Sequence, residues 1–368
     1  MLELPKILDS HSHFCLKLLW KSCLDLGSCD NFSEIWEKLS HLKKGKLNLA
    51  VGYHNERFAL DKRDLEKLPP LVIINYSLHG FTANREAIKL LNLNSIPPEQ
   101  AMLDVWKYWA ANEIEEDAQS FRERAVEQAK QWSDLGLYGA CDMLSFALPI
   151  EFENFYLENY YPDLDKRKVK IFLDGSLGAK TAAFTRELLL YEDQQLYKIL
   201  EESTEKELAI HAIGPLAIEQ ILNAIERLTQ RSHKIRLEHC QFIDKTQALR
   251  AKGLNLILSM QPNFNRDSFT YKTWLGLEWA IKNNPFRMLI DEVGFQPGKD
   301  LIFGSDNLPL GLAPALETAL FGELEEQRLS LEELLKGYRA DSGHGTTLYD
   351  IDYTKKRASL HKRREAKF

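Results

Sequence analysis

Two histidines stand one residue apart near the start of the chain, in the segment DSHSHF at residues 9–14. Because side chains alternate along a β-strand, His11 and His13 would point to the same side of a strand and could hold one metal ion. The chain contains ten histidines, so chance could also produce this spacing. The rest of the sequence has to decide between the two interpretations.

Other residues of metal-ligand type recur at predicted strands, mostly where a strand ends. Seven β-rich runs predict strands at residues 6–11, 137–143, 169–174, 207–212, 234–239, 254–260 and 300–306. His11, His211, His239 and Asp306 end four of these runs, and Lys170 lies in a fifth. One histidine at a strand end is commonly structural, whereas several such residues on different strands favour a shared site. Imidazole and carboxylate groups are ligands suited to zinc or a similar divalent ion.

The pattern of the elements indicates how these residues would be brought together. Amphipathic stretches at 117–136 and 215–231 lie between predicted strands, which is typical of βα units around a parallel sheet. We predict an α/β fold, a distorted TIM (β/α)8 barrel, with a short eighth strand near 145–150. In such a barrel the active site forms at the carboxyl ends of the strands. Two further strand-like runs, 46–53 and 70–77, predict an insertion at the barrel mouth over residues 40–116, after the first strand.

Composition restricts the class of protein and its partners. Hydrophobic residues make up 44% and charged residues 27%, as in ordinary globular proteins. No apolar run approaches the ~18 residues of a membrane span, and the N-terminus lacks signal-peptide features, so we expect a cytoplasmic protein. The five cysteines form no CxxC pair, which indicates reduced thiols.

Charge is distributed unevenly along the chain. The net charge is −7, although the segment 355–368 is strongly basic. A basic tail can bind nucleic acid, but this one has no interleaved aromatic residues and the rest of the chain is acidic. We therefore expect a small-molecule substrate and neither nucleic acid nor membrane as a partner. A homodimer is compatible with the sequence.

The order HxH, Lys, His, His, Asp resembles the amidohydrolase superfamily of metal-dependent hydrolases. It is most similar to amidohydrolase family 3, the branch with N-substituted formamide deformylase-like enzymes. The motifs with this resemblance are HGFTANREAIKLL (79–91), VKIFLDGSLGAKTAAF (169–184), IHAIGPLAIEQILNAIE (210–226), RLEHCQFI (236–243), LSMQPNF (258–264) and FGSDNLPL (303–310). The resemblance spans about residues 8–320.

The chain also departs from the family's pattern. Members usually have a β-sandwich built from segments before and after the barrel, but HxH begins here at residue 11 and DSGHGTTLYDIDYTKKRAS lacks a strand-rich closing segment. We expect a barrel over 1–340 with no evident β-sandwich domain, followed by a basic C-terminal tail over 341–368. Pro215 replaces a usual acidic residue, and Asn307 follows GSD. These changes put the substrate in question more than the metal.

The resemblance implies a role for each site residue. His11 and His13 would hold one metal ion and His211 and His239 a second, so that one or two divalent ions, zinc in the first place, are expected. Lys170 would bridge them as a carboxylated lysine, since an ammonium group has no lone pair to offer. Alternatively, Lys170 only ends the basic run 166–170.

Asp306 has two interpretations, a chemical and a structural one. By resemblance it would be a further metal ligand and the catalytic residue that takes a proton from water and passes it to the leaving nitrogen. It could instead cap the helix that follows. Asp174 could support the ligands, contact substrate or cap a helix, and His79 could contact substrate.

These roles imply hydrolysis of a C–N bond in a small amide, cyclic amide or N-acyl compound by metal-activated hydroxide. One alternative is a deaminase on the same barrel. Purine deaminases have a glutamate three residues after the histidine of the fifth strand, where this chain has Gly214. The other alternative is a catalytically inactive relative that acts by binding.

Overall fold

The computed structural model describes residues 1–54, 58–75, 80–93, 98–146, 150–229 and 234–361. The chain forms two compact units. The first unit comprises Met1–Phe14, Val126–Ser145 and Pro149–Phe368, and the second comprises Cys15–Ala125 and Phe146–Leu148. All the predicted site residues except His79 belong to the first unit. His79 lies outside the described residues.

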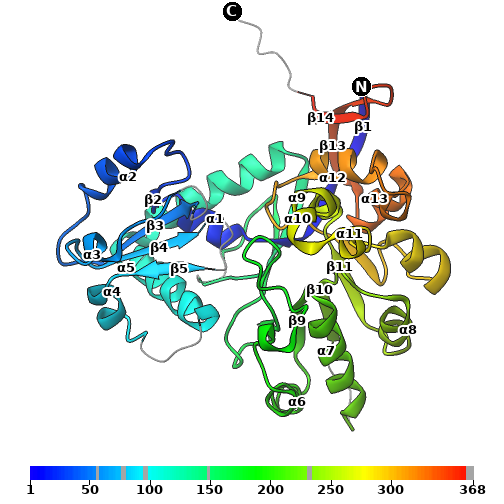
Figure 1. The fold of residues 1–368 in the computed structure, drawn as a ribbon. Helices are drawn as coiled ribbons and strands as arrows, with labels where there is room; N and C mark the ends of the chain where they lie inside the picture. Colours follow the sequence, from blue (N-terminus) through cyan, green and yellow to red (C-terminus); the bar gives the residue numbers. More distant parts are fainter. Residues whose placement is uncertain (55–57, 76–79, 94–97, 147–149, 230–233, 362–368) are drawn as a thin grey trace, which may run out of the picture. The chain divides into compact units, whose positions relative to one another are not determined.

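Parallel strands form the centre of the first unit (Figure 1). One parallel run joins β1 (Leu2–Ser12), β6 (Leu137–Asp142) and β7 (Tyr156–Asn159). A second run joins β8 (Lys168–Phe172), β9 (Glu207–Ala212), β10 (Lys234–His239), β11 (Ile257–Met260) and β12 (Leu301–Phe303). Each of the seven predicted strands is therefore confirmed, two of them to the residue.

Helices alternate with the strands of the second run. They are α6 (Asp193–Glu202), α7 (Pro215–Arg227), α8 (Lys245–Gly253), α12 (Leu312–Leu320) and α13 (Leu331–Gly337). Helix α7 shows why the sequence predicts them: it begins with a proline at its first turn and buries Ile218, Ile221 and Ile225, which share one helical face. Figure 1 shows α7 and α8 beside β9 and β10.

Short helical segments follow the ends of several strands in this unit. They are η1 (Arg186–Leu188), η2 (Pro262–Arg266), α9 (Asp267–Thr270), α10 (Lys272–Leu275), α11 (Leu277–Ala280), the π-helix η3 (Met288–Val293) and η4 (Glu325–Gln327).

The eight parallel strands do not form the closed barrel that the sequence predicts. Among the described residues, β7 and β8 are joined by a single bridge between Tyr161 and Val169, and no ladder joins β12 to β1. A backbone–backbone hydrogen bond, from Asp306 N to His11 O at 2.7 Å, links the ends of those two strands, together with side-chain contacts. We call these two places, between β7 and β8 and between β12 and β1, the seams. Each seam includes a short strand, β7 with four residues or β12 with three, so little backbone is available there for pairing.

The eighth strand is also not where it was predicted. Within 145–150, the described residues have no regular structure, and the additional strand is β7 at Tyr156–Asn159. Its sequence, YLEN, contains one aliphatic residue, so hydropathy does not mark it.

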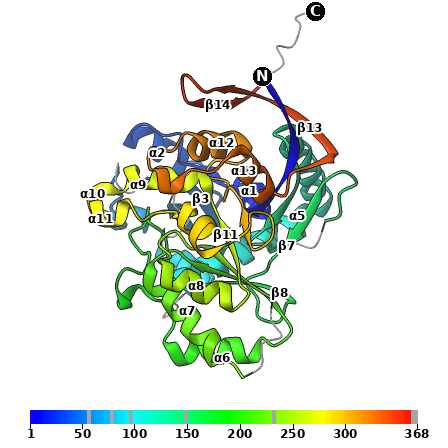
Figure 2. The same ribbon diagram turned by 90° about the vertical axis from the view of Figure 1, so that its right-hand side faces the viewer.

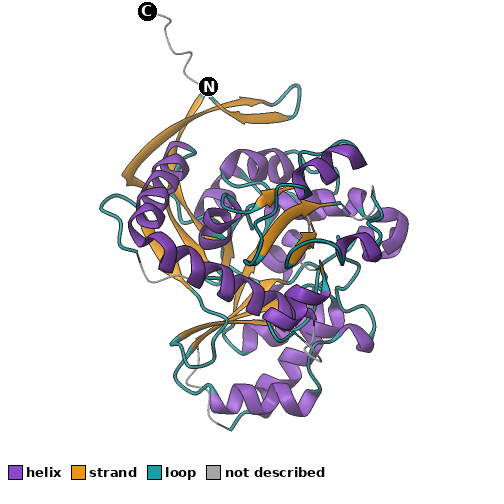
Figure 3. Ribbon diagram, turned by 90° about the vertical axis from the view of Figure 1, so that its left-hand side faces the viewer, coloured by secondary structure: helices purple, strands orange, loops and turns teal. Residues whose placement is uncertain are grey.

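The expectation that the segment beginning at residue 341 is not rich in strands is wrong. This segment forms β13 (Asp341–Asp352), which pairs antiparallel with the start of β1, and β14 (Arg357–Leu360), which pairs antiparallel with β13. Figures 2 and 3 show this three-stranded ribbon beside the N-terminus. Tyr349 in β13 is 1% exposed and pairs with Leu2, so the segment has a buried face that anchors it. Residues 362–368 lie outside the described residues.

The second unit is built on a four-stranded sheet. Strands β2 (Leu24–Asp25), β3 (Asn48–Tyr53) and β4 (Leu71–Asn75) are parallel, and β5 (Phe81–Ala83) is antiparallel to β4. Its helices include α2 (Phe32–Leu39), α3 (Lys62–Leu65) and α4 (Arg85–Leu90), and each is capped by an Asn or Asp side chain at its start. Two helices, α1 (Phe14–Trp20) and α5 (Pro98–Asp134), contain residues of both units, and α5 is kinked at Asp117.

This unit contains the predicted insertion. The runs at 46–53 and 70–77 correspond to β3 and β4, and the unit is wider than 40–116, reaching Cys15 and Ala125. Its location at the mouth of a barrel stays a prediction. In the part of the chain that the structure describes, no helix is both long and apolar enough to cross a bilayer. All five cysteines lie in the described residues, and no disulfide joins any of them there.

Candidate functional site

The four predicted ligand histidines and Asp306 lie together in the first unit. The ring centroids of His11 and His239 are 4.7 Å apart, those of His211 and His239 4.4 Å, and those of His11 and His13 5.5 Å. Asp306 Oδ1 lies 2.9 Å from His13 Nε2 and 3.6 Å from His11 Nε2. Ligand atoms of His11, His239 and Asp306 all lie within 4.8 Å of one another, a spacing at which one ion could contact all three.

The backbone at two strand ends turns these side chains inward. His239 has φ 72° and Asp306 has φ 55°, both in the left-handed region that non-glycine residues rarely adopt. Strand alternation would place Glu238 and His239 on opposite faces, yet both side chains contact the cluster. Such conformations cost about 1–3 kcal/mol each and are concentrated at functional sites.

Hydrogen bonds to acceptor oxygens orient three of the rings. His11 Nδ1 lies 2.5 Å from Glu238 Oε2, His239 Nδ1 lies 2.7 Å from Gln261 Oε1, and His211 Nε2 lies 2.9 Å from the carbonyl oxygen of Gly175. Because each partner atom is an acceptor, each of these nitrogens is the protonated one of its ring. The second nitrogen of each ring is then the basic one, which a metal ligand requires.

Burial favours the neutral form of the central histidines. It lowers the pKa of His11 well below its usual range, and the charge of Lys170 acts in the same direction. The pKa of His239 is lowered in the same way by burial and by the charge of Lys170. Neutral imidazole is the form that binds metal ions.

Lys170 lies in the same buried region. Its Nζ is buried and has no hydrogen-bond partner among the described residues. The Nδ1 atom of His13 is likewise buried and without a hydrogen-bond partner among these residues. Burial lowers the pKa of Lys170 to about 8, and the charges of Glu238 and Asp306 oppose that shift. Buried polar atoms without partners are uncommon and costly. Both atoms belong to predicted ligands, so the donor set fits a metal ion as its missing partner.

Asp306 is the acidic group of the cluster and does not cap a helix. The following helix, α12, has Gly311 at its N-cap and no side-chain cap. Burial raises the pKa of Asp306, but the neighbouring groups, among them the hydrogen bond from His13 and the charge of Lys170, outweigh burial and hold the pKa below its usual value. The carboxylate is therefore ionised and able to accept a proton.

Asp174 supports the loops around the site. Its two oxygens accept hydrogen bonds from the backbone nitrogens of Ala183 (2.8 Å), Ile213 (3.0 Å) and Gly214 (2.8 Å), and Oδ1 lies 3.5 Å from His211 Nε2. Its side chain is completely buried. These contacts favour the supporting role, and a contact of Asp174 with substrate stays a prediction.

Four residues that sequence reasoning missed hold the ligands in place. Glu238 contacts His11, and Arg236 binds Glu238. Asn307 pairs with both backbone groups of His13, at 3.2 and 3.1 Å, and Asp9 accepts hydrogen bonds from the backbone nitrogens of His11 and Ser305. The regular alternation of the charged residues Lys234, Arg236 and Glu238 with Ile235 and Leu237 in KIRLEH was the available signal for Arg236 and Glu238.

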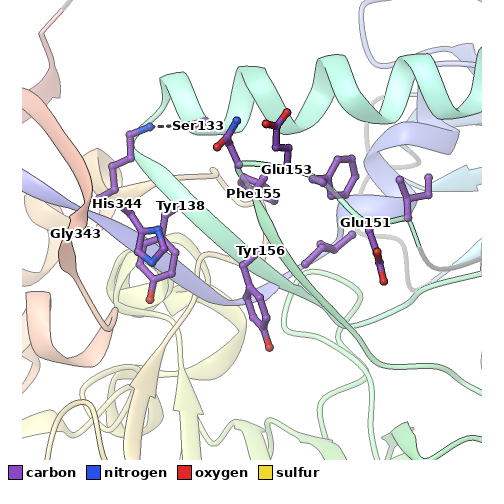
Figure 4. Close-up of a pocket in the computed structure, with 13 residues that line it drawn as sticks. Ser133, Tyr138, Glu151, Glu153, Phe155, Tyr156, Gly343 and His344 are labelled. Atoms are coloured by element: carbon purple, nitrogen blue, oxygen red, sulfur yellow. Dashed lines mark hydrogen bonds between the residues drawn. The ribbon is translucent and has the colours of Figure 1, made fainter.

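A hollow in the first unit lies away from these residues. It encloses about 660 Å³ and is lined by residues near the beginnings of β1, β6 and β7, including Lys6, Tyr138 and Tyr156 (Figure 4). The rings of Tyr138 and His344 stack there at 4.2 Å. The predicted ligands follow the opposite ends of the strands, so this hollow is separate from the histidine cluster.

The chain belongs to the amidohydrolase family, whose sequence model matches residues 4–343. This confirms the resemblance to the amidohydrolase superfamily. The chain is 34% identical over 122 residues to the putative amidohydrolase YtcJ of Bacillus subtilis (strain 168), which covers 30% of this chain and 23% of YtcJ. It is 23% identical over 366 residues to the protein LONG AFTER FAR-RED 3 of Arabidopsis thaliana, covering 76% of this chain and 62% of that protein. The chain thus spans less than two thirds of the length of either relative.

Two solved structures share the fold. They are uncharacterized metal-dependent hydrolases from Pyrococcus horikoshii OT3 and Pyrococcus furiosus, with TM-scores of 0.66 and 0.64. They are 21% and 22% identical to this chain; both matches cover 91% of it, and they cover 80% and 81% of the respective hydrolase chains. At this identity the similarity supports the fold, and the chemistry must be argued from the site.

Proposed function

We propose that this protein is a metal-dependent amidohydrolase that cleaves a C–N bond in a small amide, cyclic amide or N-acyl compound. The observation that supports this most directly is the buried cluster of His11, His13, His211, His239 and Asp306, with three rings oriented by hydrogen bonds. Family membership and the titles of the two similar hydrolase structures agree with it. We further propose that the eight parallel strands are a (β/α)8 barrel opened at its two seams.

The donor set is suited to one or two zinc ions. Imidazole and carboxylate groups are usual zinc ligands. Lys170 would join this set as a carbamate: its neutral amine would add to the carbon of carbon dioxide and release one proton to solvent. The two carbamate oxygens would then lie at a buried position where the amine has no hydrogen-bond partner among the described residues. When bound, such an ion supplies Lewis acidity, which polarises a carbonyl group and acidifies water.

The chain's own residues supply binding and proton transfer. The neutral rings of His11 and His239 offer lone pairs without requiring deprotonation at neutral pH. Asp306 accepts the proton of the attacking water on a carboxylate oxygen and returns it to the leaving nitrogen, as general base and then general acid. Its position beside His13 and His11 holds that oxygen at the centre of the cluster.

The deaminase alternative is disfavoured by packing at position 214. A Cβ on Gly214 would lie 2.5 Å from the backbone nitrogen and oxygen of Ala183, far inside van der Waals contact. The glutamate that a purine deaminase has there would therefore not fit without moving the loop after β8. The position of Gly214 also allows its N–H to bind Asp174.

Metal analysis followed by a substrate panel tests the proposal. Protein purified without chelator should contain one to two equivalents of divalent metal, mostly zinc. It should hydrolyse members of a panel of N-acyl amino acids, N-formyl amines and cyclic amides, and should not deaminate aminopurines. Turnover by metal-free, folded protein would contradict the proposal. A metal-loaded protein inactive on the whole panel would favour the inactive binding relative.

A further inference from the structure

We propose that Glu238, held in place by Arg236, is the positioning residue that makes His11 a metal ligand through Nε2. This inference rests on the proposed metal-dependent function. It assigns a role to a buried ion pair that is not itself part of the donor set.

The pair is located inside the first unit, on β10. Arg236 and Glu238 occupy alternate positions of this strand and so point to the same side. They are 7% and 0% exposed. Arg236 Nε donates to Glu238 Oε1, and Arg236 Nη2 donates to Ser259 Oγ on β11 at 2.7 Å and to the carbonyl oxygen of Ser10 on β1. The guanidinium group therefore binds groups on three strands and has little freedom to move.

Glu238 transmits this rigidity to one ligand. Its second oxygen, Oε2, lies 2.5 Å from His11 Nδ1, although the two residues are 227 positions apart in the chain. Because a carboxylate accepts, Nδ1 is the protonated nitrogen of His11 and Nε2 the basic one. His11 Nε2 points toward the cluster, 3.6 Å from Asp306 Oδ1. The ring is thus fixed in both tautomer and orientation.

A purely structural role is a poorer explanation of this geometry. A buried ion pair is often no more stabilising than well-packed apolar residues of the same volume. Here the pair has an additional, directed contact to a ligand ring, and hydrogen bonds of this kind from a carboxylate to a metal-binding histidine commonly change metal affinity by about 10–100-fold. The contact therefore assigns the pair to ligand positioning.

Zinc affinity, measured by chelator competition on metal-free full-length protein, tests the inference. In the double variant Arg236→Met/Glu238→Leu, both charges and the acceptor are replaced by apolar side chains of similar size. We expect its zinc affinity to fall about 10–100-fold. In Arg236→Met/Glu238→Gln an amide oxygen can still accept from His11 Nδ1, so part of the loss should be recovered. We call Arg236→Met/Glu238→Leu the leucine variant and Arg236→Met/Glu238→Gln the glutamine variant. The absorption bands of the Co²⁺-loaded protein should differ from the wild-type bands in the leucine variant and lie closer to them in the glutamine variant.

Glu158→Gln is the matched control. Glu158 is a largely buried glutamate on β7 that pairs with Lys168 and lies 3.1 Å from Cys141 Sγ, and neither partner is a predicted ligand. The zinc affinity of the Glu158→Gln protein should stay within about twofold of the wild-type affinity. Circular dichroism and melting temperature show whether each variant is folded. If the leucine variant does not fold, Glu238→Asp replaces it, because the shorter side chain keeps the charge and loses the contact with Nδ1.

The outcomes separate this inference from the proposed function. A folded leucine variant, or the aspartate variant in its place, with zinc affinity and Co²⁺ spectrum equal to those of wild type would overturn the positioning role. A wild-type protein that binds neither zinc nor cobalt would overturn the proposed function itself. Loss of affinity in the leucine variant with partial recovery in the glutamine variant supports both.

Discussion

Asp306 is the residue with the clearest chemical role in the cluster. It lies beside His13 and His11, its pKa stays low in spite of burial, and it caps no helix. Asp306→Asn keeps the shape and removes the basicity. General acid–base catalysis contributes ~10²–10⁴-fold, so kcat should fall by that factor, about 3–5 kcal/mol of transition-state stabilisation.

The melting temperature of the same variant is the control for this prediction. The asparagine Oδ1 can still accept from His13 Nε2, so folding should persist. Asp306→Asn with near-normal kcat would remove Asp306 from the proton transfer and with it the mechanism proposed above.

Lys170 determines how many metal ions the site can hold. Its buried amine has a pKa of about 8 and no hydrogen-bond partner in the described part of the chain, which suits it to carboxylation. Lys170→Ala should lose about one equivalent of metal, as measured by elemental analysis, and bicarbonate should promote reconstitution of the wild-type apo-protein only. Lys168→Ala, on the same strand but paired with Glu158 and Glu207, is the control and should keep its metal. Unchanged metal content in Lys170→Ala would leave a site with one ion and no carbamate.

At the scale of elements, the contact between the end of β12 and β1 brings Asp306 next to His11 and His13. Gly304 follows β12 directly, and a Cβ there would lie 2.2 Å from the backbone nitrogen of His11 and 2.6 Å from its Cβ. Asp9 and Ser305 tie the same two segments together, with Ser305 N donating to Asp9 Oδ1 at 2.9 Å. The close approach explains how Asp306 reaches His11 and His13 although no ladder joins these strands.

Gly304→Ala should therefore affect both stability and metal binding. Inserting a methyl group into a packed contact costs about 1–3 kcal/mol, and here β1 would have to move together with His11. We expect a lower melting temperature and a reduced zinc affinity. Gly253→Ala is the matched control, because a Cβ at Gly253 meets no atom within 4 Å. Equal behaviour of the two variants would show that the β12–β1 contact is looser than described.

Across the first unit, the predicted ligands come from β1, β8, β9 and β10 and from the segment after β12. An ion that binds all of them would bind the folded state and not the unfolded chain, and so would stabilise the fold. At a free concentration 100 times the Kd the gain is about 2.7 kcal/mol. Removing metal with a chelator should therefore lower the melting temperature, and added zinc should restore it.

A variant without the central ligands is the control for this effect. His11→Ala/His239→Ala should melt at the same temperature with and without chelator. If its melting temperature falls by as much as that of wild type, the stabilising ion is bound elsewhere.

Local sequence determined most of the parallel strands and the types of residue at their ends. The strands at 207–212 and 234–239 could be predicted to the residue because ELAIHA contains a short apolar run and KIRLEH alternates apolar with charged residues, and both patterns are typical of strands. The left-handed backbone at His239 and Asp306 could not be predicted, since neither histidine nor aspartate requires a positive φ. The eighth strand was predicted near 145–150 and is instead β7, because YLEN has too little hydrophobic pattern to be recognised as a strand.

Only tertiary structure decided the remaining features. DSGHGTTLYDID is polar and glycine-containing, and it is a strand because β1 offers it a free edge and a place to bury Tyr349. The contact of Glu238 with His11 joins residues 227 positions apart, and no local pattern records such a pairing. The sequence by itself determined which residues could bind a metal ion and at which strand ends they lie, because both follow from residue type and periodicity. The side-chain partners that orient those ligands depend on which strands become neighbours, and that is settled only when the whole chain has folded.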